Sequence, residues 1–245
     1  MTVLLEAKDL SRSFGNFVAV KDVSFQISKG SVVGFLGPNG AGKSTTMRLL
    51  TGYLQPDRGT AMIAGHDIVM DTRRARANLG YLPEAATGFP NLTVREFLKY
   101  CGECRGLWGS DLGTAIDRVC HETELTSALN QKIHTLSKGW RQRAWFAQAI
   151  LHDPPVLIFD EPTDGLDPNQ KNHVRKFIKS IAPHKAIILS THILEEAEEI
   201  CDRVVIIADG KIVADDSPKK LFDRKGRLAR SFQRLTAPET AKVRH

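Results

Sequence analysis

A glycine-rich stretch, residues 37–45 (GPNGAGKST), limits what this chain can fold into more than any other feature. It fits the pattern G-x-x-x-x-G-K-[ST] and lies between a short apolar block and a run of helical character, which is the setting that the pattern requires. Glycines let backbone N–H groups turn inward around phosphate oxygens, and the N-terminus of the following helix adds about half a positive charge there. We therefore expect a phosphate site formed by Gly37, Pro38, Asn39, Gly40, Ala41, Gly42, Lys43, Ser44 and Thr45.

Within this stretch, two side chains have specific expected roles. Lys43 should contact the β- and γ-phosphates of a nucleotide, and the Ser44 hydroxyl should bind Mg²⁺. The sequence thus predicts nucleotide binding on a strand–loop–helix unit.

Two adjacent acidic residues end a second apolar block, residues 156–160 (VLIFD). In an extended chain, neighbouring side chains point to opposite faces, so Asp160 and Glu161 can have different roles. We expect Asp160 to complete the Mg²⁺ shell and Glu161 to orient or deprotonate the attacking water. His192 follows another apolar block, where an imidazole can contact the γ-phosphate and sense its loss.

Short apolar runs alternate with helical patterns along the chain, which predicts an α/β fold with a mostly parallel core sheet. The first 30 residues favour antiparallel strands, and residues 88–150 favour a helical insertion. Further strands are predicted at residues 31–36, 60–65, 78–83, 156–160 and 186–191, helices at 168–181 and 194–200, and a hairpin turn at Asp209-Gly210.

We interpret residues 1–245 as one domain with three parts. Residues 1–87 and 151–216 would form the catalytic core, residues 88–150 a helical subdomain, and residues 217–245 a basic C-terminal tail. The tail has nine Lys and Arg residues against two acidic ones, so the net charge of +6 belongs to it and the rest is close to neutral. This distribution argues against a nucleic-acid-binding protein as a whole.

The tail also has apolar residues near helical spacing, namely Leu221, Leu228, Phe232 and Leu235. A helix docked on its own domain is the favoured interpretation. Contact with anionic lipid or a membrane partner, and contact with nucleic acid, remain as alternatives.

Nothing in the sequence predicts a membrane span, because the longest apolar run is six residues even when glycine is counted and a spanning helix needs about 20. The N-terminus has acidic residues where a secretory signal has a basic patch, so we expect an intracellular protein. Cys101 and Cys104 form one C-x-x-C, which we interpret as core or helix-surface thiols in preference to a metal or redox site.

Together these motifs resemble the ATP-binding domain of ABC ATPases over nearly the whole chain. Residues 37–45 resemble Walker A, and residues 156–162 resemble Walker B with its catalytic glutamate. Residues 136–140 (LSKGW) resemble the family signature, residues 164–167 the D-loop, and residues 190–192 the switch histidine. Residues 80–84, 136–143 and 231–236 are similar to one branch, the ATPases of ABC-2-type exporters.

The resemblance implies a P-loop NTPase of ABC type, with ATP and Mg²⁺ as cofactors. Glu161 and His192 would be catalytic, and Mg²⁺ would be held by Ser44 and Asp160, with Glu84 as a further candidate ligand. Beyond residues 37–45, the resemblance assigns to the ATP site Phe14, as the aromatic that stacks on adenine, together with Glu84, Ser137, Gly139 and Asp167.

The resemblance also implies partners. Two such domains would face each other head to tail around two ATP molecules, with Ser137 and Gly139 of each binding the γ-phosphate held by the other. A separate transmembrane permease would turn this closure into transport, which places the chain in the cytoplasm on the inner face of the membrane. No nucleic-acid partner is expected.

The chain departs from the family pattern in three places. Glu84 stands where the wider family has glutamine, Phe14 stands where tyrosine is usual, and the signature has Lys138 and Trp140. Lys138 either assists the phosphate or is solvated, and solvation is favoured.

Two other functions remain in view. One is an ABC-type ATPase that acts on nucleic acid or the ribosome, although such proteins usually have two cassettes or a long coiled-coil insertion. The other is a regulatory module without turnover, against which the intact Lys43, Asp160, Glu161 and His192 argue. The transported substrate and the choice between homodimer and heterodimer are not specified by the sequence.

Overall fold

Two β-sheets form the centre of the molecule, which is described here from a computed structural model covering residues 2–85, 88–164, 166–222 and 227–237. The four-stranded sheet is antiparallel, in the order β2-β1-β4-β5. Its strands are β1 (Val3–Phe14), β2 (Phe17–Ser28), β4 (Arg58–Ile63) and β5 (His66–Asp67). It is the antiparallel β subdomain that the first 30 residues predict.

The six-stranded sheet has the order β10-β9-β3-β8-β7-β6 and is parallel except for β10. Its strands are β3 (Ser31–Leu36), β6 (Leu79–Leu82), β7 (Val156–Asp160), β8 (Ala186–Thr191), β9 (Arg203–Ala208) and β10 (Lys211–Asp216). The central strands are buried on both faces, which explains why they are continuous apolar blocks in the sequence. The predicted α/β class with a mostly parallel core sheet is confirmed.

Side chains of the parallel sheet alternate between two hydrophobic cores. Val33 and Phe35 of β3 pack into the core between the two sheets, which also contains α1 (Lys43–Leu50). Val32 and Leu36 pack into the core on the opposite face, together with residues of most of the other helices. This alternation follows from the two-residue period of a strand, and it fixes the direction in which β3 delivers the chain to the glycine-rich loop.

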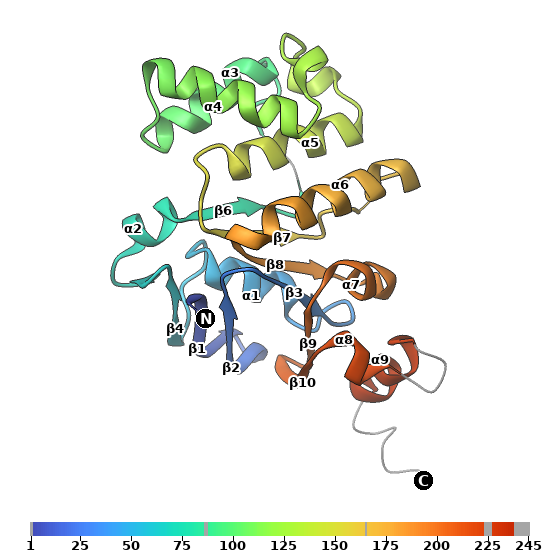
Figure 1. Ribbon diagram of the computed structural model, residues 1–245. Helices are drawn as coiled ribbons and strands as arrows, with labels where there is room; N and C mark the ends of the chain where they lie inside the picture. Colours follow the sequence, from blue (N-terminus) through green and yellow to red (C-terminus); the bar gives the residue numbers. More distant parts are fainter. Residues whose placement is uncertain (1, 86–87, 165, 223–226, 238–245) are drawn as a thin grey trace.

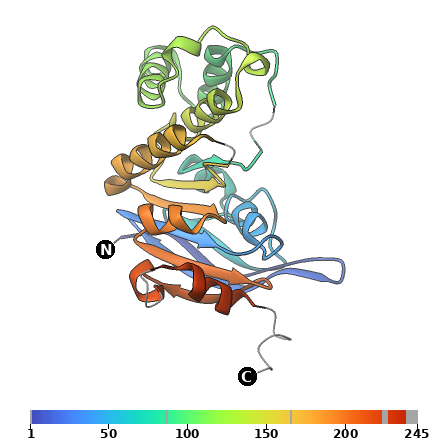
Figure 2. The ribbon, with the colours of Figure 1, turned by 90° about the vertical axis from the view of Figure 1, so that its right-hand side faces the viewer.

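The helical insertion lies at one end of the molecule, as Figures 1 and 2 show. Its helices are α3 (Val94–Cys104), α4 (Gly109–Glu122) and α5 (Lys138–Ile150), with 3₁₀ turns at Thr126–Ala128 and Ile133–Thr135. Thr93 and Glu96 form a capping box that starts α3. Cys101 and Cys104 both lie on α3, and the four cysteines are free thiols.

Other helices complete the layers beside the parallel sheet. They are α2 (Thr72–Ala77), α6 (Pro168–Ile181) and α7 (Leu194–Ile200), with a 3₁₀ turn at Ala182–His184. Pro168 takes the first turn of α6, as predicted. Within the described part of the chain, every helix is too short or too polar to cross a bilayer.

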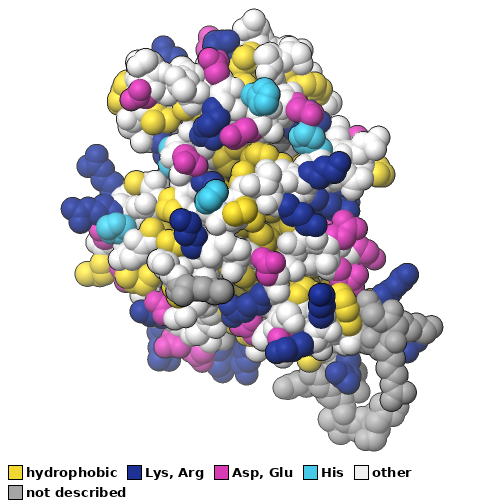
Figure 3. All heavy atoms as spheres, viewed as in Figure 1, with side chains coloured by type: hydrophobic (Ala, Val, Ile, Leu, Met, Phe, Trp, Pro, Cys, Tyr) yellow, Lys and Arg dark blue, Asp and Glu magenta, His cyan; other side chains and the backbone are white. Residues whose placement is uncertain are grey.

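The tail forms two short helices, α8 (Pro218–Leu221) and α9 (Ala229–Thr236), whereas the spacing of its apolar residues predicts one helical run. Leu228 is fully buried, its backbone N–H donates to Glu198 at 2.7 Å, and Phe232 and Leu235 pack against the core. This agrees with a tail docked on its own domain. On the face in Figure 3, basic and acidic side chains are interspersed. Residues 223–226 and 238–245 of the predicted basic tail lie outside the described residues.

Gly80 of β6 lies close against the backbone of α5. A Cβ at this position would lie 2.1 Å from Ala149 O and 2.6 Å from Leu157 Cδ2. We expect Gly80→Ala to lower the free energy of unfolding by about 1–3 kcal/mol through overpacking, measured as a lower urea midpoint. Gly113→Ala, on α4 with open space around it, is the control and should leave the midpoint unchanged or higher. An unchanged midpoint for Gly80→Ala would contradict this account.

Candidate active site

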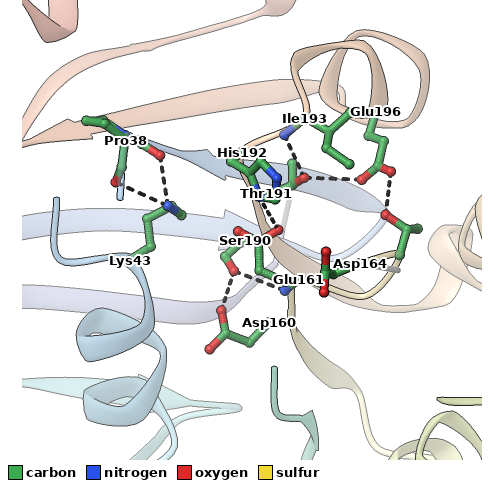
Figure 4. Close-up of polar contacts among 12 residues, drawn as sticks. Pro38, Lys43, Asp160, Glu161, Asp164, Ser190, Thr191, His192, Ile193 and Glu196 are labelled. Atoms are coloured by element: carbon green, nitrogen blue, oxygen red, sulfur yellow. Dashed lines mark hydrogen bonds and ion pairs between the residues drawn. The ribbon is translucent and has the colours of Figure 1, made fainter. Parts of the chain in front are cut away.

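The glycine-rich loop connects β3, which ends at Leu36, to α1, which begins at Lys43. Lys43 is buried, and its Nζ donates to Gly37 O at 2.8 Å and Pro38 O at 3.3 Å (Figure 4). Gly42 has a φ of 106°, and a Cβ there would lie 2.4 Å from Ala19 O. Glycine is therefore required where the loop meets the helix, and the loop holds the lysine across its own carbonyl groups.

A cavity of about 330 Å³ opens above this loop. It is lined by Phe17, Ala19, Asn39, Gly40, Gly42, Lys43, Ser44, Thr45, Glu84 and Glu161. A buried cation, two hydroxyls and the first turn of a helix suit phosphate, and two carboxylates suit a hard metal ion. The residues present thus fit both a nucleotide and Mg²⁺.

Asp160 ends β7 directly opposite Ser190 of β8 in the parallel register. The Ser190 hydroxyl donates to Asp160 Oδ1 and accepts from the Glu161 backbone N–H at 3.2 Å (Figure 4). Burial raises the pKa of Asp160, and hydrogen bonds from Ser190 and Ser44 partly oppose this. A cation placed beside this carboxylate and Ser44 would favour the ionised form, which fits the expected Mg²⁺ ligand pair.

Glu161 and His192 contact each other across the ends of β7 and β8. Glu161 Oε2 lies 2.9 Å from His192 Nδ1, and Glu161 is largely buried whereas half of the His192 side chain is exposed. Burial raises the pKa of Glu161, and the hydrogen bond and charge of His192 oppose the rise. Glu161 has a φ of 50°, a left-handed conformation that is costly for a non-glycine residue and is concentrated at functional sites.

The signature residues lie outside this cavity. Ser137 caps α5 and accepts from Trp140 N at 3.4 Å, and Gly139 is buried in the first turn of that helix. Lys138 forms an ion pair with Asp164 at 3.1 Å, with both side chains about half exposed. The structure thus gives Lys138 a carboxylate partner.

Two further predicted ATP-site residues have local partners. Asp167 caps α6, accepting from Asn169 N at 2.9 Å and Gln170 N at 3.0 Å. Phe14 is about half exposed, with the Arg12 guanidinium 5.2 Å from its ring centre. The roles of Asp167 and Phe14 toward ATP stay predictions.

Two residues of the site were missed by sequence reasoning. Phe17 lines the cavity and pairs with Phe14 across the β1–β2 hairpin. Its position three residues after Phe14, the predicted adenine-stacking residue, is the feature of the sequence that could have identified it. Ser190 joins Asp160 to the Glu161 backbone, and it stands two residues before His192 at the end of a predicted strand. Its role depends on the register of β7 and β8, for which the sequence carries no direct signal.

The fold and the site define a P-loop nucleoside triphosphatase, with a phosphate loop, a strand-end carboxylate pair and a histidine at the carboxyl edge of one parallel sheet. Comparison with known proteins agrees with this class. The model of the family described as ABC transporter matches residues 20–164, and the chain belongs to the ABC transporter family. As a member of its ATP-binding proteins, it binds ATP and is an ATPase.

Several relatives span most of the chain. The linearmycin resistance ATP-binding protein LnrL of Bacillus subtilis is 34% identical over 91% of this chain and 72% of its own length. The Nod factor export ATP-binding protein I of Paraburkholderia xenovorans is 37% identical over 89% of this chain and 72% of its own length.

Solved structures agree on the fold. The structure of an ATP-binding subunit of an ABC transporter superposes with a TM-score of 0.86 at 32% identity, covering 95% of this chain and 99% of that one. A bacterial ABC transporter cassette solved as a dimer has a TM-score of 0.80 at 23% identity, covering 87% of this chain and 98% of that one.

Proposed function

We propose that this chain is the ATPase subunit of an ABC-2-type exporter, in which two copies close around two Mg-ATP molecules and drive a separate permease. The observation that supports this most directly is the meeting of Lys43, Asp160, Glu161 and His192 at one edge of the parallel sheet. Relatives named for Nod factor export and for linearmycin resistance support the direction of transport.

Residues that line the cavity, together with Asp160 and His192 beside it, have specific roles in the proposed reaction. Lys43 leaves its two carbonyl partners to neutralise the β- and γ-phosphates, and the loop N–H groups hold their oxygens. Ser44, Asp160 and Glu84 would hold Mg²⁺, which supplies charge neutralisation on the phosphates when it is bound. Glu161 orients the attacking water and accepts its proton, and His192 holds the Glu161 carboxylate in place.

The position of the signature residues, outside the nucleotide cavity, supports the proposed dimer. Ser137 and Gly139 start α5 away from the cavity that holds Lys43, so the helix N-terminus of a second copy would complete each site. We accordingly assign residues 1–87 and 151–216 to the catalytic core, residues 88–150 to the signature-bearing subdomain and residues 217–245 to the tail.

A second groove supports a permease partner. It has a volume of about 580 Å³, lies between the core and α5, and shares Glu84 with the nucleotide cavity. Two cations, Arg48 and Arg105, and two carboxylates, Glu84 and Asp160, line the groove. It also offers the rings of Tyr53 and Tyr81 and the Trp145 indole N–H, a buried donor that has no partner within the described residues. The rings suit an apolar partner segment, and the exposed Arg48 suits an acidic group on that segment. Docking there would hold the chain on the cytoplasmic face of the membrane.

The proposal is tested by isolating tagged protein from detergent-solubilised cells and assaying ATP turnover in the eluate. We expect a multi-span membrane protein to co-purify with ATPase activity. Arg48→Glu should lower its recovery severalfold because it places an acidic group in the groove, whereas Arg58→Glu, on an exposed position of β4, is the matched control. Recovery of ribosomes or nucleic acid, with turnover that depends on them, would contradict the proposal.

A further inference from the structure

Glu196 is a glutamate in an unexpected place. It lies on α7, whose residues Glu195 and Glu199 face solvent, yet its own accessible surface is 0%. Burial of an ionised carboxylate costs several kcal/mol unless charges and hydrogen-bond donors compensate it. A side chain kept under such conditions is expected to have specific partners.

Both carboxylate oxygens of Glu196 have partners. The Thr163 hydroxyl donates to Oε1, and the Thr191 hydroxyl donates to Oε2 at 3.2 Å (Figure 4). Lys171 Nζ and Arg175 Nη2, both from α6, lie 3.7 and 3.8 Å from Oε1. Oε1 thus accepts from the Thr163 hydroxyl and lies near two cations, and Oε2 accepts from the Thr191 hydroxyl.

The two threonines belong to the segments that carry the reacting groups. Thr163 stands two residues after Glu161, and Thr191 directly precedes His192. Thr191 Oγ1 also accepts from Ile193 N at 3.0 Å, which sets the turn around His192. The Glu161–His192 contact and the Glu196 contacts therefore join the same two segments of the chain.

We propose that Glu196 is a positioning residue for ATP hydrolysis, whose carboxylate ties the turn after Glu161 to the segment before His192 and so keeps those two side chains in contact. This inference rests on the proposed roles of Glu161 and His192. Glu196 acts through other residues, because only 1% of its side chain is exposed. The same carboxylate joins α6 to the turn that begins the D-loop.

Glu196→Ala is the first test. It removes the acceptor of two buried hydroxyls and leaves Lys171 and Arg175 without that anion. We expect kcat to fall roughly ten- to a hundredfold, because small displacements of reacting groups have effects of that size. The KM for ATP should stay within about twofold, since no residue of the phosphate loop is touched.

Three variants separate this role from general destabilisation. Glu196→Gln should restore most of kcat, because its amide can still pair with both hydroxyls. Thr163→Val removes the hydrogen bond from Thr163 to Glu196 and should also lower kcat. This variant therefore tests the inference if Glu196→Ala does not fold. Glu199→Ala is the matched control: Glu199 is on the same helix and pairs with the same Arg175 at 2.7 Å, and its loss should leave kcat unchanged.

A double-mutant cycle with His192→Ala decides between the two explanations. If Glu196 acts by positioning the Glu161–His192 pair, Glu196→Ala should cost less than about twofold when His192 is already absent. The inference would be overturned if the loss of kcat in the double mutant equalled the product of the losses in the two single mutants. It would also be overturned if Glu196→Ala and Thr163→Val both kept the kcat of the unmodified protein. Full turnover by His192→Ala alone would instead refute the proposed role of His192, which is a distinguishable result.

Discussion

Replacing Glu161 by glutamine should slow ATP hydrolysis about a thousandfold, equivalent to about 4 kcal/mol of activation free energy. The amide cannot accept the proton of the attacking water, although its size and its contact with His192 are preserved. ATP binding should be retained because the phosphate loop is unchanged, and the proposed closed dimer should accumulate. The measurements are single-turnover phosphate release, equilibrium ATP binding, and size-exclusion chromatography with and without ATP.

A matched control for this variant is Glu195→Gln, which removes a charge from an exposed position on α7. Its turnover should equal that of the unmodified protein. Normal phosphate release by Glu161→Gln would remove Glu161 from the catalytic role. Loss of ATP binding by the same variant would show that the change disturbs the cavity, which Glu161 lines.

Lys43→Ala should weaken the binding of Mg-ATP at least about a hundredfold, or roughly 3 kcal/mol, because charge-assisted hydrogen bonds to the phosphates are lost. The expected effect is on affinity, whereas the effect of Glu161→Gln is on the chemical step. Calorimetric titration with a non-hydrolysable ATP analogue measures it directly. Lys43 also donates to Gly37 O and Pro38 O, so thermal unfolding without nucleotide must be recorded alongside.

The control for Lys43→Ala is Lys29→Ala, which removes an exposed lysine between β2 and β3. It changes the net charge equally, and the affinity for the analogue should stay the same. If both variants bind the analogue as well as the unmodified protein does, the phosphate-contacting role of Lys43 is wrong.

The site-bearing strands could be predicted because they are buried on both faces. Residues 31–36, 156–160 and 186–191 are mostly apolar blocks, and each is a strand of the six-stranded sheet. Carboxyl ends of parallel strands meet at one edge, so the placement of the phosphate loop, Glu161 and His192 followed from the sequence pattern. Their chemical roles stay predictions.

The sequence pattern could not predict the shortest helices and strands or the contacts between individual side chains. Strand β5 (His66–Asp67) and helix α2 (Thr72–Ala77) are too short for apolar periodicity to be visible. The segment LEEAEEI predicts a helix, which is α7, but its pattern does not distinguish the exposed Glu195 and Glu199 from the buried Glu196. The Glu196 contacts involve Thr163 and Thr191, and only tertiary packing brings these together.

The strand order has a consequence for how the chain acquires its site during synthesis. Strand β3 ends at the phosphate loop, but both of its neighbours, β8 and β9, come from residues 186–208. The nascent chain therefore carries an unpaired apolar strand while more than half of the residues are still to be translated, a delay of roughly ten to thirty seconds at about 5–20 residues per second. Such long-range pairing slows folding and leaves a strand edge open to wrong partners. The topology that brings the phosphate loop beside Asp160 therefore also leaves β3 without a sheet partner until the residues of β8 have been synthesised.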